Sequence, residues 1–173
     1  MSCVINSGYS LQCRDNLGGI QKVFIGEYTG DDLQYSFSID NIISTFSAVG
    51  VTPSFYEFDQ EIEVGSYQEA GQFSTENGTS FYEQTLEITL QRLDAVVRNQ
   101  VKILGQGIWR ILVLDQNGRY WLMGAVNGCR VSSATPGVGK AYGDLNGAVI
   151  NFISKEKVPA YVVTEAAALT LIV

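Results

Sequence analysis

The sequence predicts a mainly β protein, a β-sandwich or barrel with one packed α-helix. Several segments alternate apolar and polar residues with the period of two that is typical of strands. Charged residues make up only 17% of the chain, while Tyr, Phe and Gly are plentiful, and this composition favours sheets over helices. A single segment has a helical period, whereas a parallel α/β sheet needs repeated helices. The order of elements therefore indicates strands, one helix and then strands.

Residues Thr79–Gln91 form the clearest predicted strand. Its apolar side chains fall on one face, and its acidic and hydroxyl side chains fall on the other. The apolar face comprises Tyr82, Leu86, Ile88 and Leu90, and the polar face comprises Glu83, Thr85, Glu87 and Thr89. We therefore expect one dry face and one wet, acidic face. An earlier strand is expected at Lys22–Tyr28, after the turn at Gly18 and Gly19.

A tight hairpin is expected around Asn117 and Gly118, because Asn-Gly is the favoured pair in short β-turns. Strands at Ile108–Asp115 and Arg119–Gly124 flank this turn, and each contains a tryptophan that should help to fill the core. Further strands are expected at Gly124–Arg130, Ala148–Ser154, Ala160–Val163 and Leu169–Val173, with a loop of small residues at Val131–Gly143.

The single predicted helix begins after Asp94, whose side chain is suited to be the N-cap. Val97, Val101 and Leu104 recur at helical spacing and form an apolar stripe that should pack on a sheet. Gly105 provides a C-terminal stop. We therefore expect one helix over 95–104, packed on the strands.

A chain of 173 residues without a linker, repeat or low-complexity block is expected to be one domain, spanning 1–173. Residues 30–77 are less regular, with many Ser, Gly and Asp between short apolar runs. We expect this region to contain an extended arm or a long hairpin rather than core.

Cysteine usage and the apolar runs indicate the compartment. Cys3, Cys13 and Cys129 are odd in number and match no zinc spacing. They are interpreted as reduced thiols, with a Cys3–Cys13 disulfide as the alternative. No apolar stretch is long enough for a signal peptide or a membrane span. We therefore expect a soluble intracellular product with no membrane partner.

Charge is distributed unevenly along the chain. Residues 23–91 contain twelve Asp and Glu and no Lys or Arg, whereas the other residues hold all eleven basic side chains and six acidic ones. The net charge of −7 is therefore the sum of −12 and +5. Such a split suits the stacking of identical subunits, positive patch to negative patch, or a wall that repels polyanions. Solubility alone is the simpler interpretation.

Catalytic chemistry has little support in the sequence. The chain contains no histidine, which is the commonest general acid–base group and metal ligand. Carboxylate pairs occur at Asp31–Asp32 and at Glu61 and Glu63, and a glycosidase can use such a pair. However, the first pair lies in a turn-like stretch, and the second has the spacing of a solvated strand face. We therefore predict no enzyme, no catalytic residue, no metal and no cofactor.

Phosphate and nucleic-acid motifs are incomplete. The segment Gly137–Lys140 resembles a phosphate-binding loop, but Ala134 and Ala141 stand where that pattern needs Gly and Ser or Thr. A calcium site at Asp31–Asp32 lacks the spacing of a dedicated loop. No basic stripe interleaved with aromatic residues is present, so specific DNA binding is not expected.

Two segments carry a family resemblance: Cys13–Tyr28, CRDNLGGIQKVFIGEY, and Gly143–Val162, GDLNGAVINFISKEKVPAYV. They resemble the ends of small virion structural proteins of tailed phages, especially those of crAss-like and related phages of Bacteroidota. In such proteins a Cys-Arg-Asp…Gly-Gly-Ile entry leads into the first strand, and a late Asp-Leu-Asn-Gly…Pro-Ala-Tyr segment closes the sheet. The resemblance covers about a fifth of the chain and transfers no catalytic residue.

The resemblance implies a tail-tube or tail-ring subunit, with a β-sandwich or barrel plus one helix. Such subunits assemble into stacked rings, expected to be hexameric, around a channel through which DNA passes without specific binding. The resemblance also implies synthesis in the bacterial host cytoplasm, location in the phage virion and contacts with other tail or neck proteins. The alternatives are a head–tail connector or tail-terminator ring, and a non-viral β-sandwich module that binds carbohydrate.

A channel of this kind predicts a role for the acidic residues. An acidic wall would repel the DNA backbone, and the wet face of a long strand can look inward in a tube built from curved sheets. The expected channel-lining residues are Glu57, Asp59, Glu61, Glu63, Glu83 and Glu87.

Overall fold

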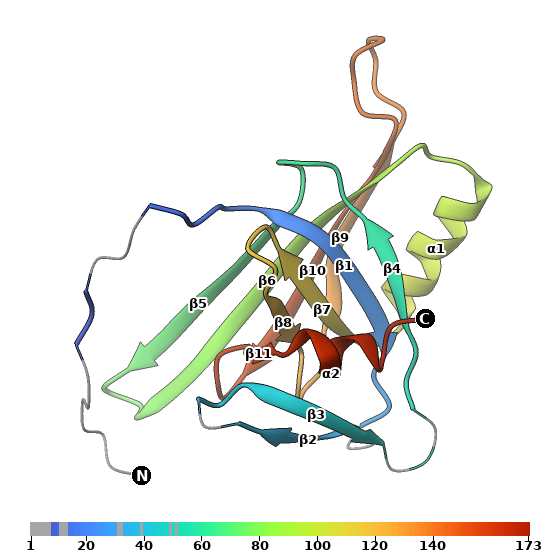
Figure 1. The fold of residues 1–173 in the computed structure, drawn as a ribbon. Coiled ribbons are helices and arrows are strands. Elements are labelled where there is room, and N and C mark those ends of the chain that lie inside the picture. The colour runs from blue at the N-terminus through green and yellow to red at the C-terminus, as the bar shows by residue number, and fades with distance from the viewer. Residues whose placement is uncertain (1–7, 11–13, 31–32, 39, 49, 51) are drawn as a thin grey trace.

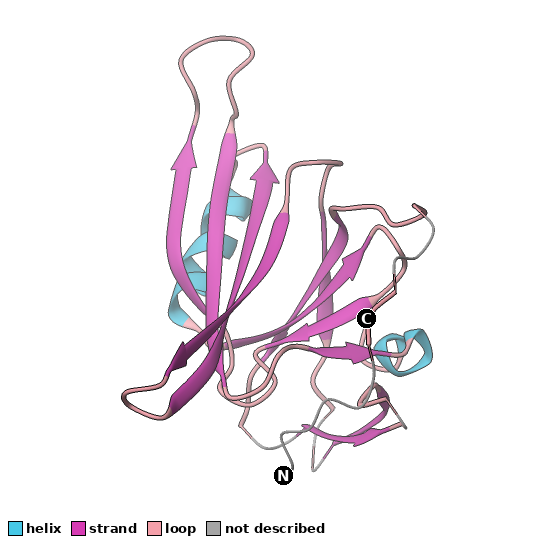
Figure 2. Cartoon of the chain, turned by 90° about the vertical axis from the view of Figure 1, so that its left-hand side faces the viewer, coloured by secondary structure: helices cyan, strands magenta, loops and turns pink. Residues whose placement is uncertain are grey.

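The computed structural model describes residues 8–10, 14–30, 33–38, 40–48, 50 and 52–173. These residues form two β-sheets and two helices, without a closed barrel (Figures 1 and 2). The two sheets pack on each other through a shared apolar layer. The predicted fold class, a mainly β sandwich with a packed helix, is therefore confirmed.

The large sheet has seven strands, drawn from both ends of the described chain. All of its neighbouring pairs are antiparallel except the pair formed by its second and third strands. In spatial order it contains β2 (Leu33–Phe37), β3 (Ile43–Ala48), β11 (Tyr161–Val163), β8 (Tyr120–Met123), β7 (Trp109–Asp115), β1 (Ile20–Glu27) and β4 (Phe55–Asp59).

The small sheet has four strands, and all three neighbouring pairs are antiparallel. In spatial order it contains β5 (Ser66–Ser74), β6 (Thr79–Gln91), β10 (Gly147–Glu156) and β9 (Arg130–Gly137). The β5–β6 turn and the β9–β10 loop lie at opposite ends of this sheet, because Gln91 rather than Thr79 pairs with Gly147 (Figure 1). The sheet is therefore long, and its two hairpins extend in opposite directions.

The core forms two layers, one on each face of the large sheet. Side chains of β1 alternate between them: Val23 and Ile25 join the layer between the sheets, and Phe24 joins the layer under α2 (Glu165–Leu169). Strand β7 is buried on both faces in the same way. Strands buried on both faces need no polar alternation. This explains the continuous apolar run at 111–114.

Helix α1 (Ala95–Gln106) contacts β9 and β10. Its N-cap is Asp94, as predicted, and the Asp94 carboxylate accepts a hydrogen bond of 2.8 Å from the backbone N–H of Val97. Leu104 is buried in the layer between the sheets, and Val101 is half-buried against it. The packing predicted for the apolar stripe is therefore found in the fold.

Two elements predicted in the C-terminal half are wrong. The loop predicted at Val131–Gly143 begins instead as strand β9, which pairs with β10 as far as Gly137. The exposed Ser, Thr and Ala side chains of β9 lack the apolar alternation of a strand that faces a core. The strand predicted at Leu169–Val173 is also wrong, because Thr164 caps the short helix α2 and only Ile172 then makes a bridge, to β4.

Three local predictions are corrected. The segment predicted as a strand at Gly124–Arg130 is mostly turn, because two of its glycines adopt positive φ. The helix continues past Gly105 to Gln106, and its C-cap is Gly107, where a Cβ would collide with the ring of Trp109. Thr89 was expected on the wet face of its strand, but it is buried, since the end of β6 is covered by the turn after β4.

Residues 30–77, expected to form an arm or a long hairpin rather than core, contribute four strands to the two sheets. Leu33, Ile43 and Phe55 are buried in the layer under α2, so part of this region belongs to the core. The same region also supplies β5, which forms a long hairpin with β6.

Cys129 is a buried free thiol whose pKa is raised by burial, which agrees with an unreactive reduced side chain. Cys3 and Cys13 lie outside the described residues. Within the part of the chain that the structure describes, no helix combines the length and apolar character needed to span a bilayer.

Candidate assembly surfaces

The small sheet has two long edges. Among the described residues, β5 pairs only with β6, and β9 pairs only with β10. Edge strands usually carry Lys, Pro or a bulge that prevents pairing with another chain. Strand β9 has Pro136 and a register shift opposite Asn151, whereas β5 is nine residues long, regular and free of Lys and Pro. These edges, and that of β5 above all, are suited to pairing with a strand of another copy.

One face of the small sheet packs in the core, and the opposite face is open to solvent. Residues that pair directly across strands share a face. On the open face Glu83 pairs with Ala70 and Lys155, and the Glu83 carboxylate lies 3.1 Å from the Lys155 ammonium. The charged side chains of the open face are Glu83, Glu87, Arg130 and Lys155, so that among the described strand residues two anions are balanced by two cations. The remaining residues of this face are mainly Ser, Thr, Gln and Asn, with a few apolar side chains.

The six acidic residues expected to line a channel occupy three separate places. Two lie on the open face of the small sheet, two on β4 of the large sheet, and two in the exposed turn between β4 and β5. In that order they are Glu83 and Glu87, Glu57 and Asp59, and Glu61 and Glu63. The wet face predicted for Glu83 and Glu87 is therefore found, while the role of all six in a channel stays a prediction.

The two acids of β4 are paired within the subunit. Lys22 of β1 forms a salt bridge with Glu57, and its ammonium lies 3.8 Å from the Asp59 carboxylate. The hydrogen bond to Glu57 raises the pKa of Lys22. By contrast, Glu61 and Glu63 make no salt bridge with any described residue. The unpaired acidic charge of this region therefore lies in the turn.

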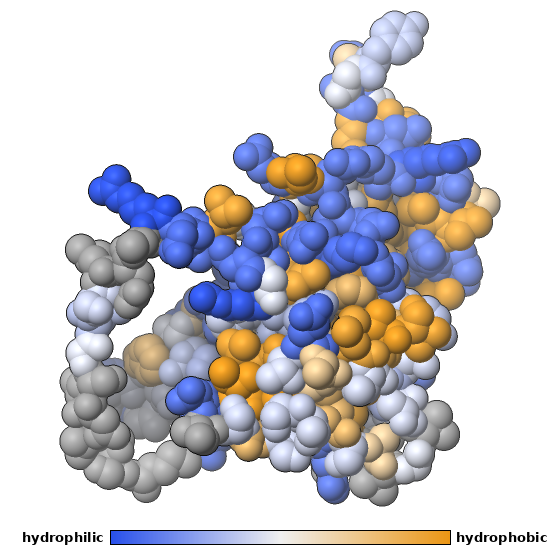
Figure 3. All heavy atoms as spheres, viewed as in Figure 1, coloured by the Kyte–Doolittle hydropathy of each residue, from blue (hydrophilic) through white to orange (hydrophobic). Residues whose placement is uncertain are grey.

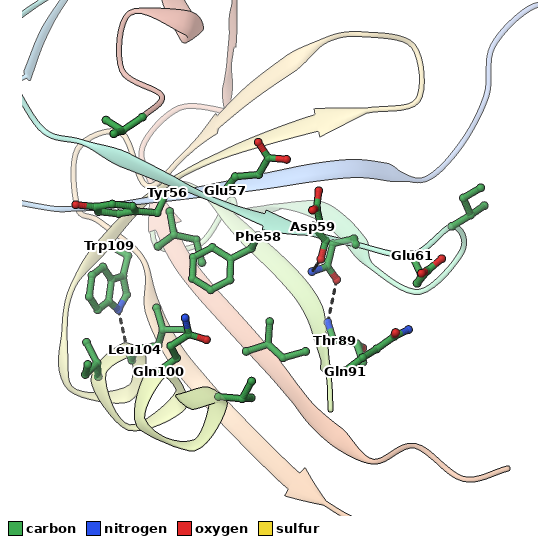
Figure 4. Close-up of a pocket in the computed structure, with 17 residues that line it drawn as sticks. Tyr56, Glu57, Phe58, Asp59, Glu61, Thr89, Gln91, Gln100, Leu104 and Trp109 are labelled. Carbon is green, nitrogen blue, oxygen red and sulfur yellow. Dashed lines mark hydrogen bonds between the residues drawn. The ribbon is translucent and has the colours of Figure 1, made fainter. Parts of the chain in front are cut away.

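A groove of about 1120 Å³ separates β4 from α1 (Figure 4). Phe58, Leu104 and Trp109 lie along its floor, and the Trp109 indole N–H donates a hydrogen bond of 2.7 Å to the Leu104 carbonyl. The Gln60 side-chain oxygen accepts a hydrogen bond of 3.0 Å from the backbone N–H of Thr89. This bond fixes the turn after β4 against the end of β6, so the groove has a rigid end.

The walls of the groove are apolar, and Glu61 is the acidic residue of its described lining that makes no salt bridge with a described residue. Tyr56 on β4 is 61% exposed and Ile103 on α1 is 49% exposed. The charged residues of the lining are Glu57, Asp59 and Glu61, and no Lys or Arg is found among its described residues. Apolar walls exposed to this extent are typical of surfaces that contact another molecule.

The β9–β10 loop, residues 138–146, extends away from the body of the subunit (Figures 1 and 3). The Asp144 carboxylate accepts hydrogen bonds from the backbone N–H groups of Lys140 and Ala141, at 2.7 and 2.8 Å. These bonds lower the pKa of Asp144. Tyr142 is fully exposed at the end of the loop. The loop is therefore held in one turn and presents an aromatic ring to solvent.

A buried arginine lies in β7. Arg110 is 2% exposed, and its Nη2 donates hydrogen bonds to the carbonyls of Gly30 and Ala125, at 3.0 and 3.2 Å. The guanidinium lies 4.8 Å from the centre of the Tyr28 ring, and burial lowers the pKa of Arg110. Glu156 is also buried nearby. Because both side chains are shielded from solvent, we interpret them as structural.

The structure describes one of the two carboxylate pairs considered in the sequence. Asp31 and Asp32 lie outside the described residues. Glu61 and Glu63 lie in a turn and not on a strand face, since β4 ends at Asp59. Over the described ranges, no three His, Cys, Asp or Glu side chains gather closely enough to hold a metal ion.

The groove and the edge of β9 were missed by sequence reasoning, whereas the β9–β10 loop lies largely within the loop predicted at Val131–Gly143. The role of this loop as a contact surface carried one usable signal, because Val138, Tyr142 and Leu145 are large residues in a stretch otherwise made of Gly, Ala, Lys, Asp and Asn. The groove carried none, since its residues come from β1, β4, β6, α1 and β7, from the turn after β4 and from the C-terminal residue.

No protein-family model, curated protein or solved structure matches this chain. The function proposed below is therefore based on the surfaces of the subunit.

Proposed function

We propose that this protein is a structural subunit that assembles into rings, like those of a phage tail tube or tail ring. The small sheet, with its free edges at β5 and β9, carries this proposal. Its four strands alternate in direction, so β9 of one copy and β5 of the next run antiparallel. A rotation that repeats this contact extends one antiparallel sheet through successive copies and can close into a ring.

The packing of the subunit supports one orientation of the small sheet in such a ring. The large sheet and α1 lie on the covered face of the small sheet, and their bulk fits only outside a closed ring. The open face then lines the channel, with Glu83 and Glu87 balanced by Arg130 and Lys155. A lining of balanced charge and small polar side chains has no excess of cations to hold the phosphates of DNA.

Ring size and location are part of the same proposal. A barrel of about 16 to 18 strands already leaves an aqueous channel, and a hexamer with four strands from each copy exceeds that number. We place the rings in the virion of a phage, stacked on one another and on other tail or neck proteins. DNA passes through the channel without specific binding.

Two neighbouring proline variants test the edge contact. Successive residues of a strand direct their N–H groups to opposite sides, so only one of Ala70→Pro and Gly71→Pro removes an N–H that points away from β6. That variant should keep the thermal unfolding midpoint of the wild type and lose its rings in mass photometry. The other variant breaks the pairing with β6 and should unfold at a lower temperature. A wild-type chain that stays monomeric at all concentrations would refute the proposal.

The groove favours a second candidate, a module that binds carbohydrate. Exposed Tyr56 and half-buried Trp109 provide aromatic surface beside the side chains of Gln60 and Gln100. A monomer that binds sugars at this groove would support that function. A connector or terminator would instead form one closed ring that does not stack on others.

A further inference from the structure

We propose that the β9–β10 loop of one copy docks in the β4–α1 groove of the next copy in the ring. This inference rests on the proposed ring and names a second contact within it. The loop and the groove are exposed surfaces of the same subunit. Both carry exposed apolar side chains, and the loop has a basic residue where the groove has an acidic one.

The strand directions bring the two surfaces together. Strand β9 ends at Gly137, directly before the loop, and β5 begins at Ser66, directly after the turn 60–65. Both points lie at the same end of the small sheet, because Gly147 pairs with both Gly137 and Gln91, and Ser66 pairs with Glu87. When β9 of one copy pairs with β5 of the next, the loop therefore lies beside the neighbouring 60–65 turn. Residues 60–62 of that turn line the groove.

The side chains are complementary. Val138 and Tyr142 are exposed apolar and aromatic groups on the loop, and Ile103 and Tyr56 are exposed on the walls of the groove. Lys140 makes no salt bridge with a described residue of its own subunit, and neither does Glu61 at the rim. Docking pairs these two charges across the contact and covers the apolar groups on both sides.

The loop is ordered before it docks. The Asp144 carboxylate holds the backbone N–H groups of Lys140 and Ala141, which fixes the turn that presents Tyr142. A segment that is already ordered loses less conformational entropy on binding. The groove, of about 1120 Å³, is slightly above the usual volume of small-ligand pockets, about 300–1,000 Å³. Its size and open shape suit a loop with several side chains.

A charge exchange tests the predicted ion pair. Lys140→Glu and Glu61→Lys should each weaken ring assembly by about two- to fivefold per contact, the range of exposed ion pairs. The double variant should restore assembly to near the wild-type level, because the pair is rebuilt with its charges exchanged. Single variants that leave assembly unchanged, or a double variant that is no better than the singles, would overturn the docking.

A cysteine cross-link tests the position of the loop. Under oxidation, Tyr142→Cys combined with Ile103→Cys should give covalent dimers and higher multiples in a denaturing gel. The matched control combines Tyr142→Cys with Val96→Cys, since Val96 is exposed on the same helix but lies outside the groove lining. The wild type controls for the native cysteines. Cross-links within a single chain, or equal yields in the control pair, would overturn the docking.

The two proposals fail in different ways. If the wild type forms rings but shows neither the specific cross-link nor the charge rescue, the docking is wrong and the ring stands. If the wild type stays monomeric and unlinked, both are wrong. Rings with the specific cross-link and the charge rescue support both.

Discussion

Glu156→Gln should destabilise the fold more than any exposed acidic substitution. Glu156 is 2% exposed at the end of β10. Its Oε1 accepts hydrogen bonds from the backbone N–H groups of Val126 and Asn127, at 3.2 and 2.9 Å, and from the Ser154 hydroxyl at 3.3 Å. The carboxylate also provides negative charge near the buried guanidinium of Arg110. It thus holds the turn after β8 against the small sheet.

The magnitude follows from these contacts. A hydrogen bond to a charged group contributes about 1.5–3 kcal/mol, and one between neutral groups about 0.5–1.5 kcal/mol. Glutamine keeps an acceptor but loses the charge, which costs about 1 kcal/mol for each of the two backbone bonds. Loss of the anion near Arg110 adds a similar amount, because a buried cation is costly without compensation. We therefore expect a loss of about 3 kcal/mol, or about 6–12 °C in Tm for a chain of this size.

Urea denaturation followed by tryptophan fluorescence measures this change, at a protein concentration where wild type and variant are both monomeric. Glu76→Gln, in the exposed β5–β6 turn, is the matched control and should stay within about 0.5 kcal/mol of the wild type. Adding Arg110→Met to Glu156→Gln should cost less than the sum of the two single changes, since the charges interact. A Glu156→Gln variant as stable as the control would refute the reasoning.

Three further outcomes are expected. Val101→Asp should lower the free energy of unfolding by about 2 kcal/mol or more in urea denaturation, because it buries a charge against the core. Val96→Asp, at an exposed position of the same helix, should lower it by less than about 0.5 kcal/mol, and equal losses would contradict the packing. The pKa of Asp144 is lowered from 3.8, so the two hydrogen bonds that its carboxylate accepts in the loop are complete above pH 3.8 and are lost as the pH falls through the lowered pKa. An NMR titration of the Lys140 and Ala141 amide protons measures this loss, and signals that change near neutral pH would contradict it. Replacing Glu83 and Glu87 by Lys removes the salt bridge to Lys155 and places like charges opposite each other, which should cost about 1 kcal/mol in stability, and it should give the assembled rings a salt-dependent affinity for DNA; no such affinity would contradict the channel-lining role.

The sequence predicted the parts of the fold where a segment faces the core on one side. The two faces of β6 and the stripe of α1 leave a periodic trace, because burial selects apolar residues at every second or every third to fourth position. The hairpin at Asn117 and Gly118 and the N-cap at Asp94 depend on local chemistry, so they too were predictable. In each case the signal comes from neighbours in the sequence.

The parts that could not be predicted depend on contacts absent from any local pattern. Strand β9 is exposed along most of its length, so nothing selects for alternation, and only its pairing with β10 makes it a strand. Helix α2 is one short turn stabilised by the Thr164 cap and by burial of Ala167 and Ala168. It is too short to show a helical period, and the apolar segment Leu169–Val173 at its end has the β-branched composition of a strand. The groove exists only because the end of β6 brings α1 beside β4.

The charge split along the chain also changes meaning once the chain is folded. Two acids of the basic-free segment 23–91, Glu57 and Asp59, are met by Lys22, and Glu83 is met by Lys155, so cations from outside the segment pair with three of its twelve acidic side chains. Separation along the sequence is therefore only partly kept on the surface. The charges left unpaired in the turn 60–65 and in the β9–β10 loop lie at one end of the small sheet, on opposite sides of the contact in the proposed ring. Their arrangement favours a role in the contact between copies over a role in the channel wall.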